Sequence, residues 1–217
     1  MTPGKVEVVV PAGTSERRVH QFLLLKQHWV IDALKRLEAR AQCVKILAPT
    51  FYGNGADIPF QGQSFKLSVH PTHLKKIKIE FAEQFVAAVP EPMLNRDHSD
   101  EVRAVLIRWL KNRARSQVEH YVQQHSDRYQ LLPRSIKIKT QKSRWGSCGI
   151  HNDIHINWLL ILAPPAVLEY VVVHELCHIE IRNHSDRFWN LVSAHLPDYQ
   201  RHRRWLKEHG ASLMLGL

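Results

Sequence analysis

An apolar helical run that ends in two histidines constrains the fold of this chain more than any other segment. Residues 167–173 place valines and Tyr170 near helical spacing, and residues 174–178 then read HELCH. Because residues four apart on a helix share one face about one turn apart, His174 and His178 can hold a single ion. Ionisable groups at the end of an apolar run are costly to bury without a partner. The segment therefore predicts a buried helix that carries part of a metal site.

The chemistry of this segment favours zinc over other ions. Zinc accepts neutral imidazole nitrogens, and with three protein ligands it keeps a position open for water. Glu175 follows the first ligand directly and is placed to take a proton from the water that the ion activates. The alternative is a hydrogen-bonded pair of core histidines that Glu175 neutralises, in a chain that contains 15 histidines. We predict a zinc-dependent hydrolase with His174 and His178 as ligands and Glu175 as general base.

A third ligand has to come from beyond this helical turn. His184 is the nearest candidate, six residues after His178, and Asn183 in a left-handed conformation would let the chain turn back toward the ion. Glu180 is the rival ligand, although two residues beyond His178 it lies off the shared face. Cys148 could approach the metal, but a structural thiol is the simpler interpretation. For His184 itself, the alternative is a surface histidine near a helix cap.

The rest of the chain alternates between helical and strand-like patterns. After the turn residues PAGTSE, a long helix is expected to about residue 41, and short alternating runs across residues 43–89 indicate a small antiparallel sheet. The segment VPEPMLNRDHS is the best candidate for a linker. Later elements are expected as helices at residues 100–124, 165–181, 185–196 and 198–210, the last closed by Gly210, and as strands at residues 135–140 and 153–157.

Charge, cysteines and hydropathy bound the partners and the compartment. The formal charge of +10 favours anionic partners such as a nucleotide or nucleic acid, but the basic residues are interspersed with acidic ones, so a simple solvated surface is the alternative. Three scattered cysteines argue against a disulfide framework and for a reducing, cytoplasmic location. We expect no export signal at the start of the chain. The most apolar stretch, residues 158–173, is interrupted by Pro164, Pro165 and Glu169, which argues against a membrane span.

Three motifs in order make the sequence resemble a known family. RWGSC begins at Arg144, INW follows, and APPAVLEYVVVHELCHIEIRNHSDRFW ends at Trp189. Together they resemble the YgjP-like metallopeptidase family, which is related to the SprT-like and Wss1-like zincins. The resemblance implies zinc on His174, His178 and His184, with Glu175 as general base in the hydrolysis of peptide bonds.

The fold that this resemblance implies is α+β. It is a minimal zincin-like fold with a small antiparallel sheet packed on the active-site helix, preceded by an N-terminal helix and a small β segment. The candidate linker VPEPMLNRDHS separates the chain into two expected domains. Residues 1–95 would hold the N-terminal helix and its small antiparallel sheet, and residues 96–217 would form the metallopeptidase domain.

A substrate-binding edge is expected beside the RWGSC motif. In zincin-like folds the strand near residues 154–157 would line the cleft, where a peptide could add as a strand. Arg144 and Trp145 are the candidate substrate-binding residues, although a tryptophan next to a glycine is also typical of a hairpin core. His151 and His155 are candidates for holding the oxyanion.

Two other functions compete with a peptidase. The same activated water could attack phosphorus in a nucleotide or another phosphate ester, and the positive charge motivates this alternative, although the sequence has no glycine-rich phosphate loop. The other alternative is a protease that acts on DNA-bound substrates. SprT-like proteins often carry a zinc ribbon, but three scattered cysteines cannot build one here.

Overall fold

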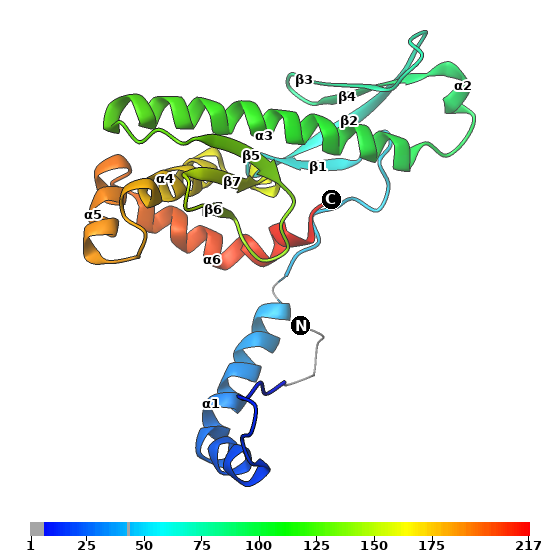
Figure 1. The fold of residues 1–217 in the computed structure, drawn as a ribbon. Helices are drawn as coiled ribbons and strands as arrows, with labels where there is room; N and C mark the ends of the chain where they lie inside the picture. Colours follow the sequence, from blue (N-terminus) through cyan, green and yellow to red (C-terminus); the bar gives the residue numbers. More distant parts are fainter. Residues whose placement is uncertain (1–6, 43) are drawn as a thin grey trace. The chain divides into compact units, whose positions relative to one another are not determined.

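The chain divides into two compact units, Met1–Val44 and Lys45–Leu217 (Figure 1). The computed structural model describes residues 7–42 and 44–217, with the backbone alone for residues 36–42. The first unit contains α1 (Glu16–Gln42), which confirms the predicted N-terminal helix. In the turn before it, the hydroxyl of Thr14 donates to the carbonyl of Pro11 at 2.7 Å. The division into domains at residues 1–95 and 96–217 stays a prediction.

The second unit contains helices and two small sheets, which confirms the α+β class. Its elements in chain order are β1 (Asp57–Phe60), β2 (Gln63–Thr72), β3 (Lys78–Phe81), β4 (Phe85–Pro90), α2 (Glu91–Leu94), α3 (Ser99–Tyr129), β5 (Ser135–Lys139), β6 (Gly146–Cys148), β7 (Asp153–Asn157), the 3-10 helix η1 (Trp158–Leu162), α4 (Pro165–Glu180), α5 (Asp186–His195) and α6 (Tyr199–Leu215). None of the described helices combines the length and the apolar content that a membrane span requires.

The first sheet has the order β1-β2-β4-β3 and is mixed. β1 pairs with β2 and β3 with β4 in the antiparallel sense, but β2 and β4 run parallel, with Leu67 opposite Phe85. The prediction of a purely antiparallel sheet is wrong at this pair. The alternation of polar and apolar residues predicts where the strands lie in the sequence. It is the same in parallel and antiparallel pairs, so it does not predict which strands pair or in which direction.

The second sheet has the order β5-β7-β6, lies against α4 and is also mixed. β6 and β7 form the antiparallel hairpin, whereas β5 and β7 are parallel. The expected antiparallel sheet on the active-site helix is corrected accordingly. Ile154 and Ile156 of β7 are fully buried, and their partners across the hairpin are Cys148 and Gly146. This face of β6 is thus turned toward α4.

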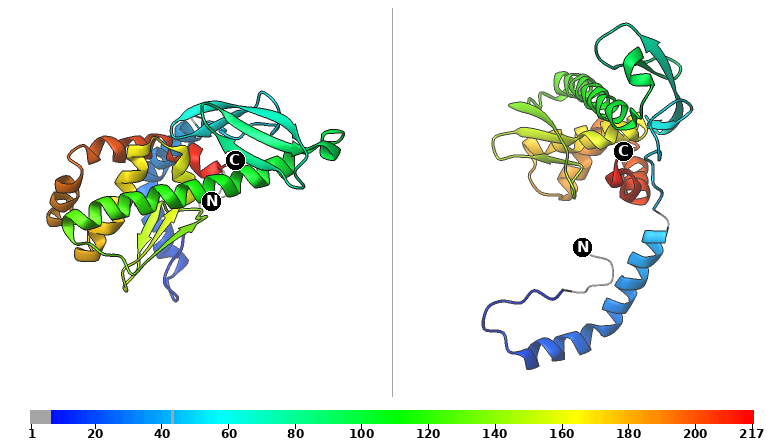
Figure 2. Two further views of the ribbon diagram at one scale, coloured as in Figure 1. Left: turned by 90° about the horizontal axis from the view of Figure 1, so that it is seen from above. Right: turned by 90° about the vertical axis from the view of Figure 1, so that its right-hand side faces the viewer.

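Helix α3 connects the two sheets. It contacts β3 of the first sheet and β5 of the second, and both views in Figure 2 show it running between them. Val102, Leu106 and Leu110 on its buried face are fully inaccessible. They belong to one hydrophobic core that also contains Phe60 of the first sheet and the apolar residues of α4. α4 is therefore held from several sides, by α3, the second sheet, α5 and α6.

Helix α6 runs on past Gly210, which corrects the expected helix end at that residue. A Cβ atom at position 210 would lie 3.1 Å from the indole ring of Trp145. Glycine is therefore used here for the close approach of Trp145 to the helix, not for a C-terminal cap. The helix ends instead before Gly216, whose φ of 72° is in the left-handed region that favours glycine.

A buried polar chain joins α4, α3 and α5. Glu169 contacts His125 Nε2 at 3.0 Å, and His125 Nδ1 lies 3.2 Å from His195 Nδ1. The ring of Tyr129 stacks on His195 at 3.5 Å between centroids. Nε2 of His195 is buried and has no hydrogen-bond partner among the residues that the structure describes. Burial, together with the charges of His125 and Arg128, lowers the pKa of His195 to about 4.

This pKa predicts a loss of stability in mild acid. An unfolded histidine titrates near 6.5, so the contribution of neutral His195 is fully present above that pH and is lost as the pH falls toward about 4. We expect roughly 3 kcal/mol of unfolding free energy to disappear over this range, measured by urea unfolding in the presence of a chelator. A His195→Phe variant, which keeps the stacking on Tyr129, should flatten the slope. An identical slope in the variant would assign the acid sensitivity to other groups.

Candidate metal centre

His174 and His178 lie on one face of α4, as the four-residue spacing predicts. Their ring centroids are 4.9 Å apart. Phe188 of α5 is fully buried beneath them, stacked on His178 at 4.5 Å and edge-on to His174 at 5.0 Å. An apolar ring on the side away from solvent fixes both imidazoles and keeps water from that side of the site.

His184 reaches the same place because α4 stops and the chain reverses. The helix ends at Glu180, and Ile181 takes an extended conformation with φ −125° and ψ 108°. The expected left-handed Asn183 is wrong, since the non-glycine residues with positive φ in the described chain are Gln61, Gln130 and Asn152. The extended Ile181 also points its carbonyl back, where it accepts a hydrogen bond from His178 Nδ1 at 2.9 Å.

The three Nε2 atoms converge on one point. His184 Nε2 lies 3.1 Å from His174 Nε2 and 3.2 Å from His178 Nε2. The hydrogen bond from His178 Nδ1 to the carbonyl of Ile181 places the proton of the neutral ring on Nδ1, so Nε2 has a free lone pair. One proton on His184 cannot serve both neighbours, whereas one cation between the rings satisfies all three nitrogens. In the described residues these are the groups that could hold a metal ion, and their donor set fits one.

The charges of the site follow from burial. Desolvation, with the neighbouring His178, His184 and Arg203, lowers the pKa of His174 to about 3. The pKa of His178 is also lowered, mainly by burial. Both imidazoles are therefore neutral near pH 7, the form that binds metals. Burial beside the apolar core, which leaves the residue 6% exposed, raises the pKa of Glu175 to about 8.

Gly146 of β6 makes room for the carboxyl group of Glu175. A Cβ atom at this position would lie 2.5 Å from Glu175 Oε1 and 2.7 Å from its Cγ. Such a contact cannot be accommodated without moving the glutamate, since the other side of its helix is packed against the core. The glycine of the RWGSC motif is thus a packing requirement of Glu175, a role that sequence reasoning did not predict.

Gly146→Ala should therefore impair any reaction that depends on Glu175 while leaving metal binding intact. We expect a ten- to hundredfold lower rate, because small displacements of a reacting group have effects of about this size. The measurement is the rate of peptide hydrolysis at equal metal content. Gly149→Ala is a matched control, because a Cβ atom there meets its nearest neighbour at 3.6 Å. An unchanged rate in Gly146→Ala would show that the carboxyl group has no fixed position.

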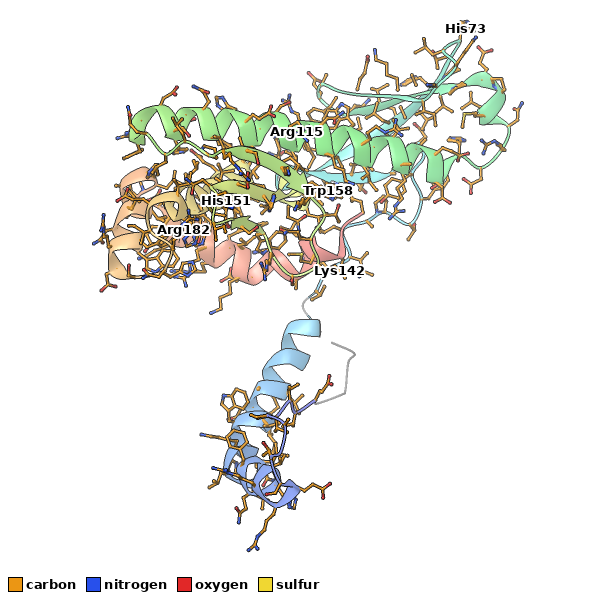
Figure 3. The ribbon with its side chains drawn as sticks, in the orientation of Figure 1. His73, Arg115, Lys142, His151, Trp158 and Arg182 are labelled. Atoms are coloured by element: carbon orange, nitrogen blue, oxygen red, sulfur yellow. The ribbon has the colours of Figure 1, made fainter. Side chains whose placement is uncertain are left out.

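Arg182 ties the segment before His184 to the β6–β7 turn. Its Nη1 donates to the carbonyl of Gly149 at 2.8 Å and lies 3.3 Å from Cys148 Sγ. Its Nη2 donates to the side chain of Asn152. Figure 3 shows Arg182 on the side of the molecule where His151 marks this turn. The loop that delivers His184 is therefore fastened to the edge of the second sheet.

We expect Arg182→Ala to weaken metal binding by about tenfold, since residues that hold a ligand in place contribute on this order. Competition with a metal-binding dye measures this affinity. Arg187→Ala is the control, because Arg187 lies a few residues further on and forms a surface ion pair with Glu180 at 2.9 Å. Equal affinities in the two variants would contradict a role for Arg182 in positioning His184.

The remaining candidates from the sequence lie apart from the three nitrogens. Glu180, the rival ligand, pairs with Arg187 at the surface. The thiol of Cys148 is bonded to Arg182, in keeping with a structural role. Cys177 is fully buried, and burial raises its pKa to about 12, as expected of a core residue. The third cysteine, Cys43, lies outside the described residues.

The predicted oxyanion and substrate residues are placed around β6 and β7. His155 lies opposite Ser147 and contacts its hydroxyl at 3.4 Å, on the sheet face away from Gly146 and Glu175. Arg144 is exposed. Trp145 is half-buried against the core and Gly210, so its ring serves packing, and a role in binding substrate stays a prediction.

Comparison with known proteins is decisive for the family. A family model described as YgjP-like, metallopeptidase domain, matches residues 1–209. The chain belongs to this family. The match covers the YgjP-like motifs around β6, β7 and α4 and extends through α1. No curated protein sequence matches the chain.

Sequence reasoning missed the residue that holds the segment before β6. Asn157 is fully buried, and its Nδ2 donates to the carbonyls of Gln141 at 2.9 Å and Arg144 at 3.1 Å. Its backbone N–H donates to the carbonyl of Trp145 at 2.8 Å. The signal was present as the polar residue of the INW motif, between the apolar Ile156 and Trp158.

Proposed function

We propose that this YgjP-like protein is a zinc-dependent peptidase in which His174, His178 and His184 hold the ion and Glu175 is the general base. The observation that carries the proposal is the convergence of three imidazole nitrogens beside a buried glutamate. Three imidazoles suit zinc, whose catalytic sites use three protein ligands. When bound, zinc would supply Lewis acidity to the attacking water and the scissile carbonyl.

The chain's own residues would perform the other parts of the reaction. Burial alone favours the protonated form of Glu175, and a cation held by the three histidines would favour its carboxylate. That carboxylate would accept the proton of the attacking water and pass it to the leaving amine. Phe188 excludes water from the inner side of the histidines. Gly146 keeps the space that the carboxyl group occupies.

Substrate binding would use the free edge of the second sheet. β6 is an edge strand of that sheet, so the backbone groups on its outer side are available to an extended peptide. Gly146 places this strand directly beside Glu175. A peptide added to β6 would therefore pass the catalytic glutamate, with Arg144 and Trp145 before it as the proposed substrate-binding residues.

A second candidate is a metal-dependent hydrolase of nucleotides or other phosphate esters. The formal charge of +10 favours an anionic partner. The second sheet also carries the exposed Lys137 and Lys139 near His155. Burial is the main cause of the lowered pKa of His155, and the positive charges of these two lysines lower it further. A DNA-associated protease would draw on the same charge.

The test measures metal content and substrate together. Purified protein should carry about one zinc ion per chain, cleave casein, lose this activity to a chelator and regain it with zinc. Protein without zinc, or casein cleavage that a chelator does not affect, would contradict the proposal. Release of phosphate from nucleoside triphosphates without peptide cleavage would instead support the second candidate.

A further inference from the structure

Arg203 of α6 lies beside the metal centre on an aromatic platform. Its guanidinium carbon is 4.5 Å from the ring centre of Trp189. Trp189 in turn stacks on the proposed ligand His184 at 5.6 Å and on Tyr199 at 5.4 Å, with interplanar angles of 23° and 13°. The indole of Trp189 therefore contacts both the guanidinium group of Arg203 and the imidazole of His184.

Tyr170 extends this cluster along α4. It lies one turn before His174, with ring centroids 5.9 Å apart, and it stacks on Tyr199 at 6.5 Å. Tyr170 and Tyr199 are 5% and 9% exposed. Neither phenol hydroxyl has a hydrogen-bond partner in the part of the chain that the structure describes. Two hydroxyl groups and a guanidinium group next to the site thus have hydrogen-bonding capacity to spare.

The charge of Arg203 is also uncompensated. Across residues 7–42 and 44–217, no carboxylate lies within ion-pair distance of it. Arginines 134, 182 and 187, in contrast, all bond to protein groups. The positive charge is near enough to act on Tyr170, where it opposes the effect of burial on the pKa of the phenol. An exposed, unpaired guanidinium beside a metal site is suited to an anionic ligand.

We propose that Arg203 binds a carboxylate side chain of the substrate next to the scissile bond, so that peptides with glutamate or aspartate at that position are preferred. The proposal rests on the proposed peptidase function. A guanidinium forms two-pronged pairs with carboxylates and with phosphates. The carboxylate is favoured because the sequence has no glycine-rich loop to enclose a phosphate. Trp189, by holding the guanidinium over its ring, would limit the positions that this pair can take.

Binding to a turnover-deficient protein tests the subsite separately from catalysis. Zinc-loaded Glu175→Gln would be titrated, by fluorescence polarisation, with labelled peptides that differ only by Glu or Gln at each position in turn. We expect at least one position at which Glu binds about tenfold tighter than Gln, since charge-assisted hydrogen bonds contribute on this order. Adding Arg203→Gln should abolish the difference, and Arg203→Lys should retain part of it. Arg204→Gln, an exposed neighbour on α6, should leave it unchanged.

The outcomes separate the subsite from the reaction. No preference at any position, no peptide binding at all, or a preference that survives Arg203→Gln would overturn the subsite. Tight binding of a nucleoside triphosphate that depends on Arg203, without a peptide preference, would overturn it in favour of a phosphate ligand. An Arg203-dependent preference for Glu in a native protein that cleaves none of the peptides would retain the subsite and reject the peptidase.

Discussion

Replacing Glu175 by glutamine should lower the rate of peptide hydrolysis by a thousandfold or more while one metal ion per chain is retained. The amide is nearly the same size as the carboxyl group and fits the space beside Gly146, so the fold and the three histidines are unchanged. What is lost is the oxygen that accepts a proton, and general base catalysis contributes about 10²–10⁴-fold. The measurement is kcat with a fluorogenic peptide, alongside the zinc content of the same preparation.

Glu180→Gln provides the matched control for this variant. Glu180 ends the same helix, but it is exposed and its carboxylate pairs with Arg187. Its loss should change kcat by less than about twofold, because a surface ion pair contributes little. Near-native hydrolysis by Glu175→Gln would remove Glu175 from the mechanism, and a loss of zinc in this variant would assign the glutamate a role in the site's structure.

Removing the third imidazole should have an effect of similar size on metal affinity. In His184→Ala, two nitrogens from one helical turn remain, and the extended Ile181 no longer delivers a ligand. Replacement of groups that merely hold a metal ligand costs about 10–100-fold in affinity, so loss of a ligand should cost about a thousandfold. Titration against a zinc-binding dye gives the affinity, and hydrolysis at limiting zinc should fall in parallel.

Excess zinc and a control histidine complete this experiment. Saturating zinc should restore part of the hydrolysis by His184→Ala, since Glu175 and two ligands are still in place. His120→Ala, an exposed histidine on α3, should bind zinc as the native protein does. Native zinc affinity in His184→Ala would mean that another group completes the site, and Cys148 would then be the first to test.

The parts of the site that lie close together in the sequence could be predicted from it. The spacing of His174 and His178 and the apolar run before them predicted a buried helix, because helical periodicity is a property of neighbouring residues. The same holds for Pro164 and Pro165, which predicted the start of α4 at Pro165. Strands were likewise predicted at residues 135–140 and 153–157 from their alternation alone, and the structure has them at Ser135–Lys139 and Asp153–Asn157.

The pairing of those strands and the surroundings of the site were decided by tertiary structure. A side-chain pattern of period two is the same for parallel and antiparallel partners, so β2 with β4 and β5 with β7 could not be read from it. Gly210 was predicted to close a helix, and no packing role was predicted for Gly146, yet each permits a contact with a residue far away in the chain, Trp145 and Glu175 respectively.

The sequence by itself determined which groups can do chemistry, two histidines and a glutamate on one helical turn. The tertiary structure decided what surrounds them: the reversal at Ile181 that brings His184 to the other two histidines, the contacts of Arg182 with the β6–β7 turn, and Arg203 on Trp189. The physical reason is range. Helix geometry acts over four residues, whereas these contacts depend on packing between segments that only the folded core brings together.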